Sequence, residues 1–161
     1  HNFPDLYGQK YREMMQQKIG LTQPAAHTTG LINDLLQWME MAGADYTNTF
    51  VHLMYPGWIK DEIYEADGFR VWKERWQEAI NQQPGGSAAA LAAMKKVNPV
   101  FIPRNHLVEE AIEAATLGKD YAQLNKLLQV IANPYEKQPG NDRYKQPPLG
   151  GDGYYKTFCN T

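Results

Sequence analysis

The most reactive side chain of this 161-residue chain belongs to its single cysteine, Cys159, the third residue from the C-terminal end. A thiol reacts as its thiolate, so solvent access and nearby positive charge govern its chemistry, and Lys156 is the nearest charged side chain in sequence. A chain end is usually exposed unless the tail packs onto a domain. Two interpretations therefore stay open, an incidental terminal cysteine and a redox-active thiol. A disulfide within this chain is excluded, because there is no second cysteine.

The sequence shows no pattern typical of a metal site or of a hydrolytic serine. Its four histidines are His1, His27, His52 and His106, and no two of them have the i, i+4 spacing of a helical metal-binding pair. We expect each to be a surface histidine or a hydrogen-bonded structural one. Ser87 is the only serine, and it lacks the Gly-x-Ser-x-Gly pattern of a nucleophile elbow.

Charged residues near one predicted helix start have a structural explanation. Glu109 and Glu113 share a helical face, where paired carboxylates could serve acid–base chemistry, but near a helix start they also complement its dipole. Arg104 and Asn105 lie at the same helix start. We expect them to anchor backbone carbonyls of a neighbouring loop, because arginine offers a fixed fork of donors; direct substrate contact is the alternative.

Nucleotide chemistry has no visible site in this chain. Phosphoryl-type transfer needs a glycine-rich loop, a lysine and metal-binding Asp or Asn residues at defined positions. The pair Gly85-Gly86 lacks the spacing of a phosphate-binding loop. We therefore predict no catalytic, cofactor-binding or metal-binding residue here, and Cys159 is the one candidate site residue, as a redox group.

Size and charge narrow the class of protein. At 18.4 kDa the chain suits one domain, and its net charge of -2 argues against a dedicated nucleic-acid binder. No apolar run approaches the ~20 residues of a membrane span, and no secretory signal is visible. One cysteine fits a reducing compartment. The chain does not begin with methionine, so we expect a fragment of a longer protein.

Hydrophobic spacing predicts successive helices and no strand of useful length. The first predicted helix ends at Gly20, the second runs from Thr28 or Thr29 to Gly43, and the third from Asp45 or Thr47 to Pro56. After the aromatic stretch described below, one helix is predicted from Ser87 to Asn98 and the next from Pro103 to Gly118. The last predicted helix begins at Asp120. In the last two helices, Ile112 and Leu128 are expected to face inward with their apolar neighbours.

An aromatic stripe marks the stretch between these helices. Phe69, Trp72, Trp76 and Ile80 follow an i, i+3, i+7, i+11 pattern, which places them on one helical face. Such a face could bind a partner, but aromatic side chains carry large buried areas, so we predict a core.

The chain changes character at Asn133. Prolines and glycines make regular structure unfavourable from there on, yet several tyrosines make a freely solvated linker equally unfavourable. We predict an all-α, multi-helix domain over residues 1–132, followed by an irregular Pro/Gly/Tyr-rich tail over residues 133–161 that packs through its rings and bears Cys159.

Three segments together resemble one protein family. They are residues 98–106 (NPVFIPRNH) continuing to Ala111, residues 133–135 (NPY) with 144–148 (YKQPP), and residues 155–161 (YKTFCNT). Weaker matches are residues 45–50 (DYTNTF) and 72–76 (WKERW). In this order and spacing they resemble the C-terminal third of the selenoprotein O (YdiU-type) family.

The resemblance implies a function that the residues alone do not. Members of that family are protein adenylyltransferases with a kinase-like fold, which move AMP from ATP onto protein hydroxyl groups with Mg. It implies catalysis in an N-terminal kinase-like domain, which would be the partner of this chain, together with the enzyme's protein substrates. Relatives in eukaryotes often carry selenocysteine at the position of Cys159, which favours a redox role. A cytoplasmic location is expected for a bacterial member and a mitochondrial one for eukaryotic relatives.

Two other functions compete with that expectation. One is a stand-alone helical interaction module without catalytic activity, which would use the aromatic helix as its binding face. The other is a small thiol enzyme that uses Cys159, which is disfavoured because the local sequence places no base near the sulfur.

Overall fold

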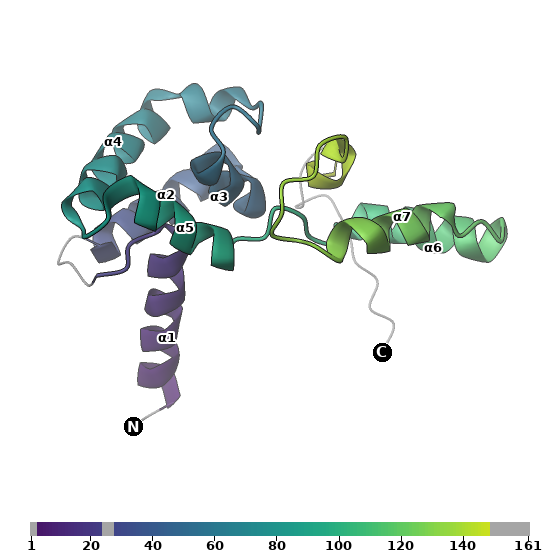
Figure 1. Ribbon diagram of the computed structural model, residues 1–161, viewed down its shortest axis with the longest axis horizontal. Coiled ribbons are helices and arrows are strands. Elements are labelled where there is room, and N and C mark those ends of the chain that lie inside the picture. The colour runs from purple at the N-terminus through teal and green to yellow at the C-terminus, as the bar shows by residue number, and fades with distance from the viewer. Residues whose placement is uncertain (1–2, 24–27, 149–161) are drawn as a thin grey trace. The chain divides into compact units, whose positions relative to one another are not determined.

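A computed structural model describes residues 3–23 and 28–148 of the chain, and these residues form helices and connecting turns without a strand. The predicted all-α class is therefore confirmed. The α-helices are α1 (Phe3–Lys18), α2 (Thr28–Ala42), α3 (Tyr46–Met54), α4 (Asp67–Gln82), α5 (Gly86–Val97), α6 (Asn105–Leu117) and α7 (Ala122–Ile131), with short 3₁₀-helices η1 (Glu62–Glu65) and η2 (Asp142–Lys145) (Figure 1). None of the described helices is long and apolar enough to cross a membrane.

The chain divides into two compact units, His1–Asn98 and Pro99–Thr161. The first unit contains α1 to α5 and η1, and the second contains α6, α7 and η2. The boundary expected at residue 133, between a helical domain and an irregular tail, stays a prediction. Of that tail, the described residues up to Pro148 form turns and η2, and Cys159 lies outside the described residues.

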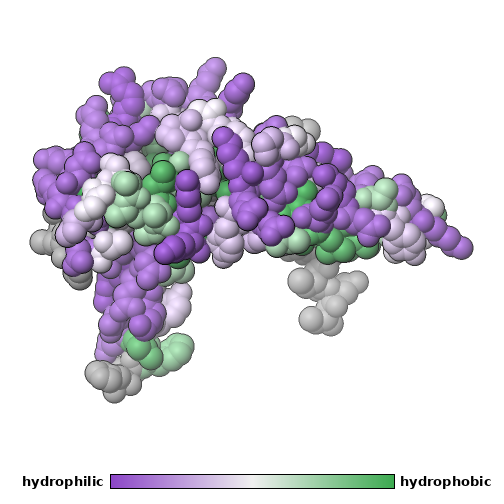
Figure 2. All heavy atoms as spheres, in the orientation of Figure 1, coloured by the Kyte–Doolittle hydropathy of each residue, from purple (hydrophilic) through white to green (hydrophobic). Residues whose placement is uncertain are grey.

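Helix α3 is the centre of the first unit. Every residue from Asn48 to Met54 is buried, as expected for a helix that other elements cover on all sides. Of the two predicted starts, Asp45 and Thr47, the structure has Asp45, whose side chain accepts a hydrogen bond from the backbone N–H of Asn48 at 2.7 Å. Figure 2 shows hydrophilic side chains over most of the visible face of this unit.

The aromatic stripe of α4 is core, as predicted. Phe69, Trp72, Trp76 and Ile80 are all buried, and the rings of Trp72 and Trp76 stack with centroids 5.8 Å apart. Each indole N–H donates to a backbone carbonyl at 2.8 Å, Trp72 to Leu31 in α2 and Trp76 to Ile19 after α1. This burial removes the binding face on which the interaction-module alternative depended.

Helix α1 ends in a turn at Gly20 that is hydrogen-bonded to the end of α4. Gly20 adopts a left-handed φ of 73°, and the N–H groups of Gly20 and Leu21 donate back to carbonyls of the last helical turn. A Cβ atom at Gly20 would lie 3.0 Å from Ala90, so the close approach of α5 also requires glycine. The Gln83 side chain donates to the Gly20 carbonyl at 2.7 Å, which ties this turn to the end of α4.

Three predicted helix starts are displaced in the structure. Helix α5 begins at Gly86 with Gly85 as its cap, so the prediction that Ser87 caps it is wrong; the Ser87 hydroxyl bonds the Asn81 side chain instead. Helix α6 begins at Asn105, after Pro103. Asp120 lies one residue before the cap of α7, although its carboxylate still accepts from the N–H of Ala122.

The second unit is built on the hairpin of α6 and α7. Leu107 and Ala111 of α6 and Leu127 and Val130 of α7 are buried. Ile112 and Leu128 are about half exposed, so the prediction that they face inward is wrong. The physical reason is that two helices facing each other cover only one narrow seam of each, and a wider apolar stripe extends beyond it.

Candidate functional site

Two of the family-like segments meet in the second unit. The carbonyl oxygen of Pro134 accepts hydrogen bonds from the backbone N–H groups of Val100 at 2.7 Å and Phe101 at 3.1 Å. Both of these residues are fully buried. The turn after α7 is therefore fastened to the extended segment before α6, although more than thirty residues separate them in sequence.

Arg104 fastens a third stretch of chain to the same place. Its guanidinium Nη2 donates to the carbonyl oxygen of Lys145 at 2.9 Å, and the Arg104 side chain is only 5% exposed. This confirms the expectation that Arg104 anchors a backbone carbonyl of a neighbouring loop. Asn105, for which the same role was expected, is exposed at the first position of α6.

A buried lysine completes this anchor, which we define as Arg104, Pro134 and Lys145. The Lys145 side chain is 2% exposed, and its ammonium group lies 2.7 Å from the Asp142 carboxylate within η2. A buried charge is tolerated only when it is paired, so the turn of η2 supplies the partner locally. Arg143 of η2 also pairs with Glu110 of α6 at the surface. The anchor orders the chain, and its one amine, that of Lys145, is buried in an ion pair.

Asn98, the first residue of the family-like segment 98–106, makes a different contact inside the first unit. Its side-chain N–H donates to the Lys18 carbonyl at 2.8 Å, and its amide oxygen accepts from the Lys18 ammonium at 3.1 Å. That ammonium also lies 4.6 Å from the ring centre of Phe50, and burial lowers the pKa of Lys18. Asn98, the residue that caps α5, therefore ties the end of α1 to the end of α5.

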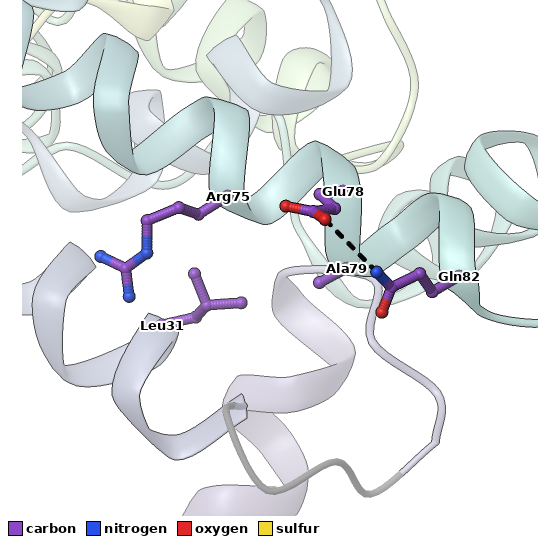
Figure 3. A pocket seen from close by; sticks show the side chains of 5 residues that line it. All are labelled: Leu31, Arg75, Glu78, Ala79 and Gln82. Atoms are coloured by element: carbon purple, nitrogen blue, oxygen red, sulfur yellow. Dashed lines mark hydrogen bonds between the residues drawn. The ribbon is translucent and has the colours of Figure 1, made fainter.

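The polar hollow beside α4 is the first place where a ligand could be sought (Figure 3). It measures about 260 Å³ and is lined by Leu31, Arg75, Glu78, Ala79 and Gln82. Arg75 lies 2.8 Å from the Asp34 carboxylate, so its charge is already compensated. Ligand pockets usually enclose about 300–1,000 Å³. A small, charge-balanced hollow of this kind is a poor binding site.

A second hollow is lined mainly by apolar side chains. It measures about 250 Å³ and lies between α3, α4 and α5, where its walls include Leu53, Met54, Trp76, Ile80 and Met94. Lys73 and Gln77 are the polar members of this lining that α4 contributes. Neither hollow combines the convergent polar groups and the volume that catalysis on a nucleotide requires.

His52 is the most unusual titratable group of the first unit. It is buried in α3, and its ring stacks on Tyr64 with centroids 4.1 Å apart. No described residue gives its Nδ1 atom a hydrogen bond. Burial and the nearby Lys73 charge lower the pKa of His52, against a smaller opposing effect of its hydrogen bond with the Ile59 backbone. The Tyr64 hydroxyl, which bonds Thr49 at 3.2 Å, has its pKa raised by burial to about 12.

Acid is expected to destabilise the first unit through His52. Its folded pKa lies below the ordinary value of 6.5, so below that pH the unfolded chain takes up a proton that the folded chain refuses. The free energy of unfolding should therefore fall as the pH drops below about 6.5, by at most ~1.4 kcal/mol per pH unit for this one group. Urea unfolding between pH 7.5 and pH 5 measures the slope. His52→Gln should flatten it, and an unchanged slope in that variant would contradict the assignment.

The remaining candidate residues do not converge. Glu109 and Glu113 are both exposed on α6, but neither lies in its first turn, so the interpretation that they complement the helix dipole is wrong. Among residues 3–23 and 28–148, no group of three or more His, Cys, Asp or Glu side chains is placed to hold a metal ion. His1, His27 and Cys159 lie outside these residues. The burial of His52 and Lys145 was not predicted from the sequence, because burial of a polar residue leaves no periodic signal.

Comparison with known proteins identifies the family. A sequence model of the family described as Protein adenylyltransferase SelO matches residues 1–132 of this chain. The chain belongs to this family. The earlier resemblance is thereby confirmed, since the match covers most of the chain and is independent of the tail residues quoted for it.

Several curated SelO-family relatives are similar along nearly the whole chain. Protein nucleotidyltransferase YdiU of Alcanivorax borkumensis is 39% identical over 155 residues, which are 96% of this chain and 32% of the relative. The YdiU protein of Syntrophotalea carbinolica is 38% identical over 99% of this chain and 32% of its own length. That of Bacillus mycoides is 42% identical over 91% of this chain and 30% of its own length. The chain thus spans about a third of the curated relatives that it matches.

Proposed function

We propose that this chain is the C-terminal helical part of a protein adenylyltransferase. The whole enzyme would transfer AMP from ATP to Ser, Thr or Tyr hydroxyl groups of proteins, with pyrophosphate as the second product. The observation that carries the proposal is the match of residues 1–132 to the Protein adenylyltransferase SelO family. The relatives' shared name, protein nucleotidyltransferase, supports the same reaction class.

The described residues do not fit a Mg-ATP site of their own. Phosphates and Mg require carboxylate oxygens and backbone N–H groups that converge on one cavity. Here Glu110 and Glu113 line a hollow of about 310 Å³ whose lining has no basic side chain to bind phosphate, and the hollow beside Arg75 is small and charge-balanced. We therefore assign ATP and Mg to an N-terminal kinase-like domain, in the two thirds of the relatives' length that this chain does not span.

The role proposed for this chain is to brace that domain. The first unit offers a rigid aromatic core in α4, and the second offers a short segment fastened at Pro134 and Lys145. Rigid elements of this kind hold a neighbouring active site in place without touching the substrate. The location proposed for a bacterial enzyme is the cytoplasm.

The polypeptide of 161 residues alone is expected neither to bind Mg-ATP nor to label proteins, whereas the full-length enzyme is expected to do both. Calorimetric titration with Mg-ATP and transfer of labelled AMP to a mixture of proteins measure the two properties. Circular dichroism must first show that the isolated chain is helical. Micromolar binding of Mg-ATP by the isolated chain would place the nucleotide site here and overturn the assignment, while absence of transfer by the full-length enzyme would overturn the reaction.

For Cys159 we propose a reversible disulfide with a cysteine of the catalytic part. The thiols of Cys159 and of that cysteine would exchange with a small-molecule disulfide. The protein disulfide forms, and the small molecule is released as two thiols. The support is the resemblance of residues 155–161 to a segment where relatives carry selenocysteine. The same transfer assay, run on the natural enzyme and on Cys159→Ser in oxidised and reduced buffer, tests this role. Equal redox sensitivity of the two proteins would exclude it.

A further inference from the structure

The first helix of the chain is packed only at its C-terminal end. Of the residues in α1, Met15 alone is buried, and Ile19 just beyond the helix is buried with it. Helix α1 packs on α2 and α5, and at its C-terminal end the Tyr46 hydroxyl donates to the Met15 sulfur and the Trp76 indole N–H donates to the Ile19 carbonyl. Figure 1 shows the N-terminal turns of α1 leaving the other helices of the first unit.

The projecting turns carry an apolar face, which we call the α1 stripe. Its members are Phe3, Leu6, Tyr7, Tyr11 and Met14. Phe3, Tyr7, Tyr11 and Met14 follow an i, i+4, i+8, i+11 pattern, so they lie along one side of the helix. All five side chains are exposed, Phe3 by 78% and Tyr7 by 65%. Hydrophobic side chains are visible at the free end of α1 in Figure 2.

The other sides of α1 are polar. Asp5, Gln9 and Arg12 are exposed, and Gln9 donates to Glu13 one turn further on. The helix is therefore amphipathic along its projecting turns, and the side chains of its apolar side are exposed to solvent. An isolated helix of this length is only marginally stable in water, so an ordered, projecting α1 needs something to cover the stripe.

We propose that the α1 stripe docks onto the part of the SelO-family polypeptide that this chain does not contain. The relatives are about three times as long as the matched region, which supplies an occupant on the same polypeptide. A covalently continuous partner acts at high effective concentration, so it does not need the ~800 Å² per partner that stable separate proteins bury. The proposal depends on the family and on the relatives' length, and it holds whether or not the enzyme transfers AMP.

A membrane surface fits the stripe less well. Interfacial helices are rich in Lys and Arg on the polar face, so that they bind anionic lipids. In α1 the cations Lys10, Arg12 and Lys18 stand beside the anions Asp5 and Glu13, and Lys10 is paired with Glu13 at 2.7 Å. The helix thus lacks the strong basic face of a lipid-binding element.

Photo-crosslinking in the full-length protein tests the proposal directly. Benzoylphenylalanine replaces Tyr7 in one protein, where an aromatic ring already exists, and replaces the exposed Arg12 on the opposite side of α1 in the matched control. We expect position 7 to give a cross-link within one polypeptide, into the segment outside these 161 residues, and position 12 to give none. Peptide mass spectrometry identifies the linked residues.

The other outcomes of this experiment overturn the proposal. A cross-link from position 7 into residues 28–161 would show that another part of this chain covers the stripe. A product of doubled mass would show a second copy, and no product, or equal products from positions 7 and 12, would show that the stripe has no specific occupant.

Hydrogen exchange provides a readout that needs no substitution. Amides in the projecting turns of α1 should exchange more slowly in the full-length protein than in the 161-residue polypeptide, because docking adds protection that the isolated helix lacks. The amides of α3, which are covered in either case, serve as the internal reference. Equally fast exchange of the α1 amides in both proteins would contradict the docking.

Discussion

Replacing Trp76 with alanine is expected to lower the free energy of unfolding of the first unit by about 3–5 kcal/mol. The indole is only 6% exposed, and it stacks on Trp72. The substitution removes this packing, leaves a cavity beside α5, and deprives the Ile19 carbonyl of its 2.8 Å hydrogen bond. Urea unfolding followed by circular dichroism measures the loss.

A substitution elsewhere on α4 is the matched control. Val71 lies on the same helix but is 57% exposed, so Val71→Ala should change stability by less than about 0.5 kcal/mol. Trp76→Phe should fall between the two, because it keeps an aromatic ring and loses the N–H donor. A loss below about 0.5 kcal/mol for Trp76→Ala would place this side chain at the surface and restore the binding-face interpretation.

Replacing Arg104 with alanine should destabilise the attachment of η2 to the segment before α6. Its hydrogen bond to the Lys145 carbonyl is buried, and a hydrogen bond from a charged group contributes about 1.5–3 kcal/mol. We expect a loss of about that size and faster hydrogen exchange in η2, whose position depends on this contact. Arg104→Lys should recover only part of the loss, since lysine lacks the planar fork of donors.

Arg143→Ala is the control for Arg104→Ala, because it removes the same positive charge from an exposed position. It is 59% exposed and pairs with Glu110 at the surface, so Arg143→Ala should cost no more than about 1 kcal/mol. If Arg143→Ala and Arg104→Ala destabilise the protein equally, the effect comes from the loss of positive charge and not from the buried anchor.

The features that could be predicted from the sequence are those with local causes. Helix periodicity identified the buried face of α4, and the cap at Asp45 and the stop at Gly20 followed from side-chain and backbone preferences of single residues. The anchoring role of Arg104 was also predicted, because an arginine at a helix start offers a fixed fork of donors to the carbonyls of a neighbouring loop. Each of these depends on a window of a few residues.

The features that could not be predicted depend on which distant segments meet. The contact of Pro134 with Val100 and Phe101 joins residues far apart in sequence. The exposure of Ile112 follows from the narrow seam between α6 and α7, which periodicity alone does not reveal. The small hollows beside α4 and the stacked His52 have the same origin, since tertiary packing decides which polar groups lose water. Family membership was indicated by the resemblance of three sequence segments and was confirmed by the family model over residues 1–132.

The placement of the tryptophans gives the protein a built-in spectroscopic label. All four, Trp38, Trp58, Trp72 and Trp76, precede the division at Asn98, while the second unit contains tyrosines and no tryptophan. Emission excited at the red edge of the absorption band therefore reports on the first unit alone, whereas far-ultraviolet ellipticity reports on the helices of both. Superimposed melting curves from the two signals would mean that the units unfold together, and separated curves would give each unit its own transition without any added dye.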